Sequence, residues 1–569
     1  MKHRVIRALT LSALAAAAAL ALSEPARACG GFFCSQQGLV NQAAERIVFA
    51  DNGDGTITAV IQIQYQGPAD KFSWLLPIGS VPGQDQIAVS SDYAFSALQL
   101  ATNPSYTLRT TVTGSCRERR GTGSKDAPAP SAATDHDTAE QGGVSVEATG
   151  EVGNFDYAVI SVDGNGSDPA APAVDWLHQN GYDVTAEGVA LLGPYLADGM
   201  HLLALRLTKG SDTGSIRPIE LTYKADAPMI PIKLTAVAAN QDMGVLAWAL
   251  SNARAVPFNY NSLELNEARI NWFNAASNYN QVVTEAADAA GGQGFVTEYA
   301  APSSQLGRRI WSDDAERSWQ TEFGANGRFA GDSPDQLFQA LEQSYGTWSG
   351  FWDAVRKVVT PPSGMSFDDL RNCSYRTCQG LSFDPDQLHA ALDSDVIEPV
   401  RRFQRLIDRT GYMTRLYTTM SAAEMIVDPV FRFNPDLPGV SNQHSATRVV
   451  ECRDDLYESE APWRIQFRDG SILRGSPDTL GQWPDALAAQ PANQRVLMLS
   501  TSGEGRVVEE NSEQIASSLA EYNAHVPGAP DRGGFCSLQS APEIRGSGSA
   551  WSLALAALSL GWLRRRNPR

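Results

Sequence analysis

The sequence lacks the short motifs by which many enzymes are recognised. It contains no His-Glu-x-x-His zinc motif, no Gly-x-Ser-x-Gly nucleophile elbow, no phosphate-binding Gly-Lys-Ser/Thr and no dinucleotide-binding glycine pattern. Its few histidines stand far from one another along the chain, so a catalytic triad could arise only through folding. We therefore predict no catalytic residue, no cofactor and no metal ligand, and the absence favours a protein that is not an enzyme.

Two local patterns resemble parts of functional sites but are incomplete. Asp212-Thr213-Gly214 matches the loop of an aspartic protease, yet that chemistry needs two such carboxylates and the chain has no second copy. The segment 163–168 alternates oxygen-bearing residues as a calcium loop does. An EF-hand loop requires Gly at its sixth place and Glu at its twelfth, where this chain has Asp168 and Val174. Both segments are therefore predicted to be polar turns.

Basic residues are in the minority. The chain of 569 residues has 45 Lys and Arg against 64 Asp and Glu, which gives a net charge of −19 at pH 7. Such a charge repels phosphate backbones, so nucleic acid is excluded as an expected partner. The negative charge is better explained by an acidic surface that faces solvent than by a function in storing cations.

Apolar runs long enough to cross a bilayer comfortably are also missing, and a short one stands near each end. We interpret residues 1–28 as a signal peptide, because a basic start precedes an apolar stretch and Ala28 supplies a small residue before the cleavage point. Cleavage there leaves Cys29 at the mature N-terminus. Lipidation of Cys29 is an alternative, which the neighbouring Arg27 disfavours.

The other short run belongs to a predicted C-terminal sorting or anchoring tail, residues 536–569. Its apolar part, Ala550 to Leu563, would rise only about 21 Å as a helix, short of the roughly 30 Å hydrocarbon core. Three arginines follow and would stay on the cytoplasmic side. With Cys536 as its cysteine element, the tail resembles the MYXO-CTERM and GlyGly-CTERM class. The resemblance implies contact with the membrane before processing, removal by a sorting protease and retention at the cell surface; a plain tail anchor is the alternative.

Cysteine is scarce, and its odd count of seven needs an explanation in an exported protein. Assigning Cys536 to the tail leaves six cysteines. Two closely spaced pairs favour disulfides between neighbours, and elimination then joins the remaining two. The preferred pairs are Cys29 with Cys34, Cys373 with Cys378, and Cys116 with Cys452. Six cysteines allow fifteen pairings, and a zinc site is the rival interpretation, which export opposes.

The pattern of apolar residues predicts an α+β fold. We expect a β-rich module at 29–116, a flexible loop at 117–143, a second β-rich module at 144–260, a mainly helical region at 261–430 and a small mixed unit at 431–535. The β-rich modules are expected to be sandwich-like. The clearest strand is Thr56 to Gln66, whose alternation only Val60 breaks.

Several other elements follow from local signals. Strands are expected at 105–113, 157–162, 202–208, 219–223, 230–236 and 245–250, and a helix at 263–290. Ser333-Pro334 and Asp384-Pro385 are typical helix starts, and Pro399 should kink the second of these helices, which is expected to run towards Arg409. Asp469-Gly470 predicts the turn of a hairpin over 464–474.

Four tryptophans crowd the helical region: Trp311, Trp319, Trp348 and Trp352. Such a cluster can form a carbohydrate- or peptide-binding surface, but core packing is the favoured interpretation.

Several separated segments resemble the domain of unknown function 2330 family. They are residues 28–34, 41–47, 72–78, 176–182, 231–236, 414–420 and 425–429. The resemblance implies a secreted or surface bacterial protein with no assigned activity, and it supplies no catalytic residue.

Two hypotheses on function follow. The first is a non-catalytic structural or adhesive component of the cell envelope or outer surface. The second is a hydrolase of envelope polymers with a carboxylate-based site. A concave pocket with convergent carboxylates or a Ser/His pair would favour the enzyme.

Overall fold

The structure is a computed structural model. It describes residues 41–526 except 67–72, 118–144, 153–154, 163–169, 183–185, 208–216, 324–326 and 372–378. The predicted signal peptide, loop and tail therefore lie largely or wholly outside the described residues, as do the segments 163–168 and 212–214. So do the predicted disulfide and processing residues Ala28, Cys29, Cys34, Cys373, Cys378 and Cys536.

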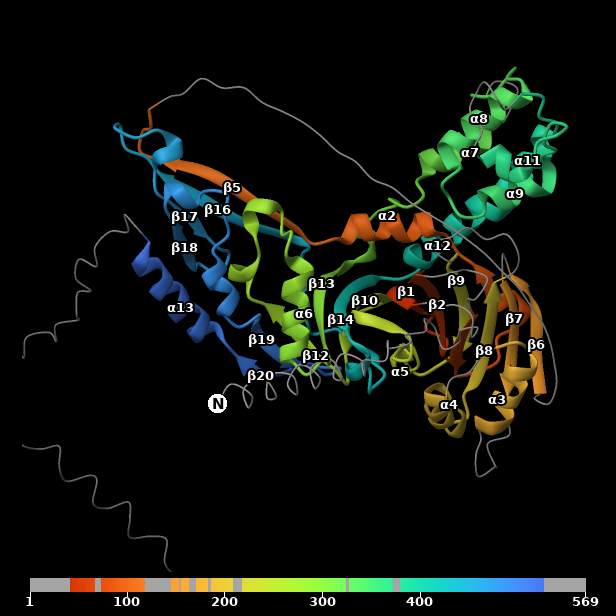
Figure 1. The fold of residues 1–569 in the computed structure, drawn as a ribbon, viewed down its shortest axis with the longest axis horizontal. Coiled ribbons are helices and arrows are strands. Elements are labelled where there is room, and N and C mark those ends of the chain that lie inside the picture. Colours follow the sequence, from red (N-terminus) through yellow and green to blue (C-terminus); the bar gives the residue numbers. More distant parts are fainter. Residues whose placement is uncertain are drawn as a thin grey trace, which may run out of the picture. The chain divides into compact units, whose positions relative to one another are not determined.

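A ten-stranded mixed sheet forms the centre of the fold (Figure 1). Its spatial order is β20 (Arg506–Glu510), β19 (Asn493–Met498), β12 (Asn261–Leu265), β13 (Gly294–Pro302), β14 (Tyr412–Met420), β10 (Ala239–Ser251), β1 (Asn41–Asp51), β2 (Thr56–Gln66), β9 (Ile219–Lys224) and β4 (Ile87–Val89). The pairs β1–β10 and β12–β13 are parallel. Strands from all four segments that the sequence pattern distinguishes thus join one sheet.

A four-stranded antiparallel sheet packs against one face of the large sheet. It consists of β3 (Ser73–Ile78), β8 (His201–Leu207), β7 (Phe155–Ser161) and β6 (Ser145–Val152). Side chains from both sheets, among them Phe49, Ile61, Phe155 and Leu203, share one buried apolar cluster. This packing of sheet on sheet agrees with the expected β-rich N-terminal region, and the α+β class is confirmed.

Helices cover the outer faces of this sandwich. On the four-stranded sheet lie α3 (Ala170–Gln179), α4 (Ala186–Ala197) and the short α5 (Ile232–Thr235). On the large sheet lie α2 (Asp92–Thr102) and α12 (Glu398–Asp408). The same apolar cluster continues away from the sheet into α7 (Asp313–Glu322), α8 (Pro334–Tyr345), α9 (Phe351–Val358), α10 (Phe367–Arg371) and α11 (Pro385–Leu392).

The expected helix starts and the tryptophan packing are confirmed. Ser333 and Asp384 cap α8 and α11, and a π-helical turn at Asp393–Ile397 separates α11 from α12, which has Pro399 in its first turn. Trp311 and Trp319 are buried, and Trp348 and Trp352 pack partly buried against the same core.

A second four-stranded sheet contains β18 (Ile472–Gly475), β17 (Trp463–Gln466), β16 (Gln443–Glu451) and β5 (Ser105–Thr113). The β17–β18 hairpin has the predicted Asp469-Gly470 turn, in which Gly470 adopts a φ of +88°. Residues from this sheet share an apolar cluster with α6 (Tyr279–Ala289) and α13 (Ser512–His525). Two short strands, β11 (Arg254–Pro257) and β15 (Phe431–Asn434), form a separate pair.

Two sequence predictions were wrong. The segment 230–236 is not a strand but contains α5, where the Lys233 amide donates a hydrogen bond to the Asp428 carboxylate, 3.0 Å away. The segment 263–290 is helical only from Tyr279, because Leu263 lies in β12 and the side chains of Asn266 and Asn271 then cap two 3₁₀ turns.

Across the described part of the chain, no helix combines the length and apolar character that spanning a membrane requires.

Candidate functional site

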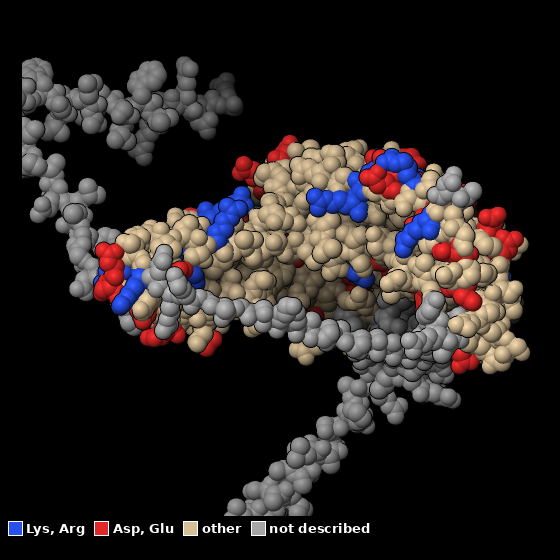
Figure 2. Space-filling view, turned by 90° about the horizontal axis from the view of Figure 1, so that it is seen from above, with Lys and Arg blue, Asp and Glu red and all other residues tan. Residues whose placement is uncertain are grey.

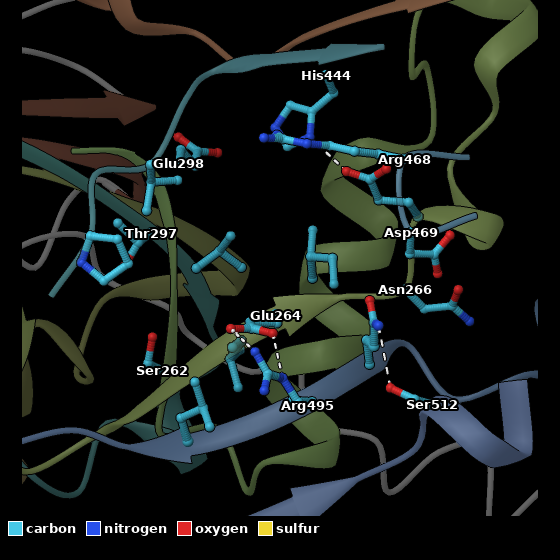
Figure 3. Close-up of a pocket in the computed structure, with 18 of the residues that line it drawn as sticks. Ser262, Glu264, Asn266, Thr297, Glu298, His444, Arg468, Asp469, Arg495 and Ser512 are labelled. Carbon is cyan, nitrogen blue, oxygen red and sulfur yellow. Dashed lines mark hydrogen bonds and ion pairs between the residues drawn. The ribbon is translucent and has the colours of Figure 1, made fainter. Parts of the chain in front are cut away.

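A cavity of about 700 Å³ lies where the large sheet meets the sheet that contains β16. We call it the junction cavity (Figure 3). Residues of β12, β13 and β19 line one side, and β16 with the β17–β18 turn lines the other. Tyr279 of α6 and Ile515 of α13 also contribute to its wall. Cavities of this size suit ligands of a few hundred daltons.

Glu298 is the most deeply buried carboxylate of the junction cavity. Its side chain is 1% exposed and forms an ion pair with Arg415 on the neighbouring strand β14, whose side chain is 5% exposed. Its other oxygen accepts a hydrogen bond of 2.7 Å from the Tyr279 hydroxyl. Burial, followed by the nearby Glu298 charge, raises the pKa of Tyr279 well above its usual range. Both oxygens of Glu298 are therefore engaged by the protein itself.

A histidine and a second glutamate form another pair in the same cavity. His444 Nδ1 lies 2.7 Å from Glu267 Oε1, and the His444 ring stacks on Tyr106 with centroids 4.4 Å apart. Burial raises the pKa of Tyr106 above its ordinary value, and the charges of Glu267 and Glu298 add to the effect. The stack holds the imidazole in place between β5 and β16.

Another glutamate, Glu264, is held by Arg495. This pair lies across the cavity from His444 (Figure 3). The guanidinium donates through Nε and Nη2 to the two carboxylate oxygens, at 2.7 and 2.9 Å. These bonds raise the pKa of Arg495. Such a two-point contact fixes both side chains, although both are exposed to solvent by about two-fifths.

Two guanidinium groups of the cavity have no carboxylate partner among the described residues. Arg254 donates from Nη1 to the Pro438 carbonyl at 2.9 Å, while its buried Nε has no hydrogen-bond partner. Burial lowers the pKa of Arg254. Arg468 is exposed at the β17–β18 turn and reaches from there toward His444 (Figure 3). These two cations are the lining groups that remain free to meet an anion.

The rest of the lining combines apolar and polar side chains, and the polar ones include the carboxylates of Asp469 and Glu504. Leu263, Val296, Leu497, Leu499 and Ile515 all face the cavity. Apolar side chains thus stand beside two guanidinium groups that have no carboxylate partner among the described residues, three internally paired glutamates and the further carboxylates of Asp469 and Glu504.

The three glutamates converge in one cavity but do not form a catalytic dyad. A pair of carboxylates that shares a proton or divides acid and base roles needs groups that are free to titrate against each other. Here Glu264, Glu267 and Glu298 are each held by a different cationic or imidazole partner.

One serine and one histidine are in hydrogen-bond contact elsewhere. Ser161 Oγ lies 2.7 Å from His201 Nδ1, at adjacent ends of strands β7 and β8. Neither residue lines the junction cavity, and within the described residues no carboxylate pairs with His201. The contact is a cross-strand pair rather than a catalytic triad.

The predicted disulfide partners Cys116 and Cys452 are bonded, with their Cα atoms 4.9 Å apart. The bond joins the ends of β5 and β16 and lies outside the cavity lining. The other predicted cysteine pairs lie outside the described residues. In the part of the chain that the structure describes, no three His, Cys, Asp or Glu residues are grouped as a metal site would require.

The cavity residues themselves were not predicted. They come from elements that range from β5 to α13 along the chain, so no single sequence window contains the whole lining. The local signal that did exist was the Asp469-Gly470 turn, which predicted the hairpin but not that Arg468 would reach a cavity.

On the face drawn in Figure 2, the described Lys and Arg side chains are interspersed with Asp and Glu. Such mixed charge is typical of a solvated surface.

A family described as an uncharacterised protein conserved in bacteria (DUF2330) matches residues 24–308, which is half of the chain. The match ends in the turn after β13, so β14, β16 and β19 lie beyond it. No curated protein and no solved structure matches the chain.

Proposed function

The chain belongs to the DUF2330 family, and we propose that it is an exported envelope protein that binds a partly apolar carboxylate in the junction cavity. The role is binding without catalysis. A medium-chain fatty acid, or a molecule with a similar apolar body and a terminal carboxylate, has the required chemistry.

The observation that carries the proposal is the pair of free guanidinium groups. Arg254 and Arg468 line a cavity that also has a group of apolar side chains, and neither arginine has a carboxylate partner among the described residues. A ligand carboxylate would supply the missing charge, and the leucine side chains would cover its apolar part. A charge-assisted hydrogen bond to arginine is among the stronger polar contacts in proteins.

The location is part of the proposal. The basic and apolar start of the sequence supports export through a signal peptide, and the Cys116–Cys452 disulfide fits an oxidising compartment. We further propose that a sorting protease acts on the tail and leaves the protein at the cell surface.

Fluorescence titration of the purified mature protein with a dansyl-labelled undecanoate tests the binding. We expect saturable enhancement of the dansyl signal, displacement by decanoate and far weaker displacement by decanol, which has no negative charge. Absence of saturable binding, or equal displacement by the acid and the alcohol, would contradict the proposal.

Arg468→Gln is the matched variant, because the side chain is exposed and its loss leaves the core intact. We expect about tenfold weaker binding, the value of one charge-assisted contact. Arg453→Gln is the control, since that side chain is 69% exposed and lines no part of the cavity.

The hydrolase remains a second candidate because several carboxylates, among them Glu264, Glu267 and Glu298, converge in the cavity. Incubation of the protein with purified envelope polymers, followed by measurement of new reducing ends or free amines, tests it. Product formation that Glu298→Gln abolishes would favour hydrolysis over binding alone.

Cell fractionation with intact-mass analysis tests export. The expected product begins at Cys29 and is found in the envelope or at the surface. A full-length protein in the cytosol with free thiols would contradict this part of the proposal.

A further inference from the structure

A second cavity, of about 620 Å³, lies at the other end of the large sheet. We call it the β4–α9 cavity. Its walls come from β4, β6, α9, the π-helical turn and the start of α12. None of its residues lines the junction cavity.

Arg217 is a buried cation in this lining. The residue is 8% exposed, and its Nη2 donates to the main-chain carbonyl of Asp395. Its Nη1 lies 3.9 Å from Asp353, too far for a hydrogen bond, and its Nε has no partner. The buried guanidinium is thus only partly compensated by the protein.

The backbone makes room for this guanidinium. Gly350 has a φ of +90°, and a Cβ there would lie 2.7 Å from Arg217 Nη2 and 2.4 Å from the Asp395 carbonyl oxygen. A side chain at residue 350 would therefore displace Arg217 from its place.

Three more cations line the same cavity. Arg402 is held by Glu220 at 3.3 Å and by the Val89 carbonyl, and Lys357 pairs with Asp395. Arg356 stands over the Phe367 ring and has no carboxylate partner among the described residues. The exposed hydroxyl of Ser394 adds a hydrogen-bond donor.

The lining of the β4–α9 cavity has more cationic than anionic side chains, whereas the chain as a whole is acidic. Four cationic side chains face three carboxylates, those of Glu151, Asp353 and Asp395, in a protein whose net charge is −19. Two of those carboxylates are near the cations Arg217 and Lys357, which leaves Arg356 as the cation most available to a ligand.

We propose that the β4–α9 cavity binds a tetrahedral oxyanion, a phosphate or sulfate group. Arg217, Arg356 and Arg402 supply guanidinium donors, and Lys357 and Ser394 supply further N–H and O–H donors. Planar guanidinium groups match the oxygens of such anions. The group could be the free ion or the end of a larger molecule, and the test separates these sources.

Isothermal titration of the mature protein with inorganic phosphate, sulfate and glycerol 3-phosphate tests the site. We expect phosphate to bind with a strength that falls as sodium chloride is added. Equal binding of phosphate and its monoester would indicate the free ion, whereas tighter binding of the monoester would indicate a larger ligand. Absence of binding by all three anions would overturn the proposal.

Arg356→Gln is the decisive variant, because the side chain is exposed and its loss should not affect folding. We expect about tenfold weaker phosphate binding. The control is Arg317→Gln on α7, whose side chain is 70% exposed and which lies outside the lining. Equal affinity in the two variants would refute the site. Arg217→Gln should abolish binding, provided that its circular dichroism spectrum matches that of the wild type.

Discussion

Arg415 and Glu298 form an ion pair inside the fold, on the adjacent strands β14 and β13, with both side chains almost completely buried. Arg415 also donates to Thr102 and to the Gln99 carbonyl of α2, each at 3.1 Å. The Arg415 guanidinium therefore connects Glu298, in the lining of the junction cavity, to helix α2. Its removal would leave a buried carboxylate without its cation.

We expect Arg415→Met to lower the free energy of unfolding by about 3–5 kcal/mol, the range for a buried pair that loses one partner. Urea denaturation followed by tryptophan fluorescence measures the change. The double variant Arg415→Met/Glu298→Gln should recover part of the loss, because the orphaned charge is gone. A double variant less stable than Arg415→Met would show that the ion pair is not the cause.

The buried carboxyl group of Glu45 should make the stability of the folded protein depend on pH. It is fully buried in β1, and burial raises its pKa from 4.5 to about 7, a shift that the hydrogen bond from Gln42 only partly opposes. Because the folded state favours the protonated acid, this contribution to stability is complete below pH 4.5 and is lost as the pH rises through 7. The difference is roughly 3 kcal/mol.

Glu45→Gln should therefore raise the melting temperature at pH 8 and change it little at pH 4.5. Differential scanning calorimetry at both pH values measures the effect. Glu513→Gln on the exposed face of α13 is the control and should show no such difference. Equal shifts at the two pH values would exclude Glu45 as the titrating group.

Asp428, which lies beyond the segment that matches the family, contacts α4 and α5 inside that segment. Its carboxylate accepts hydrogen bonds from the Tyr195 hydroxyl at 2.7 Å and the Lys233 amide at 3.0 Å, and it pairs with the Lys233 ammonium. We expect Asp428→Asn to lower the free energy of unfolding by about 1–3 kcal/mol, since the substitution removes a charge and weakens its hydrogen bonds at a partly buried position. Asp455→Asn, at a side chain 71% exposed, should change the unfolding midpoint little in the same assay.

The disulfide between Cys116 and Cys452 closes a very long loop, with a sequence separation of 336. Its loss should lower the free energy of unfolding by about 2–5 kcal/mol, because the unfolded chain gains freedom. The double variant Cys116→Ala/Cys452→Ala tests this by denaturation. Alkylation of the native protein should leave both sulfurs unlabelled until a reductant is added, and labelling without reductant would contradict the bond.

Local chemistry explains most of what could be predicted from the sequence. The alternation of Thr56 to Gln66 matches β2, and the apparent error at Val60 has a physical cause. Ile61 faces the smaller sheet while Val60 faces the helices, since β2 is covered on both sides. Capping residues such as Ser333 likewise act within a few positions of the helices that they begin.

Distant contacts explain what could not be predicted. The segment 230–236 has the composition of a strand, but its partner is the Asp428 carboxylate, almost two hundred residues later. Leu263 lies in a strand because β12 pairs with β13, which follows α6, and with β19, which is remote in sequence. The junction cavity is lined by residues of β12, β13, β16 and β19, so no local pattern indicates it.

The position of β14 has a consequence for synthesis of the protein. This strand, Tyr412–Met420, lies between β10 and β13, so the segment that matches the family cannot complete the sheet by itself. Until residue 420 has been made, β10 and β13 each keep a row of unsatisfied amide and carbonyl groups along one side. A nascent chain in that state would invite pairing with its neighbours, so it needs either shielding or rapid completion.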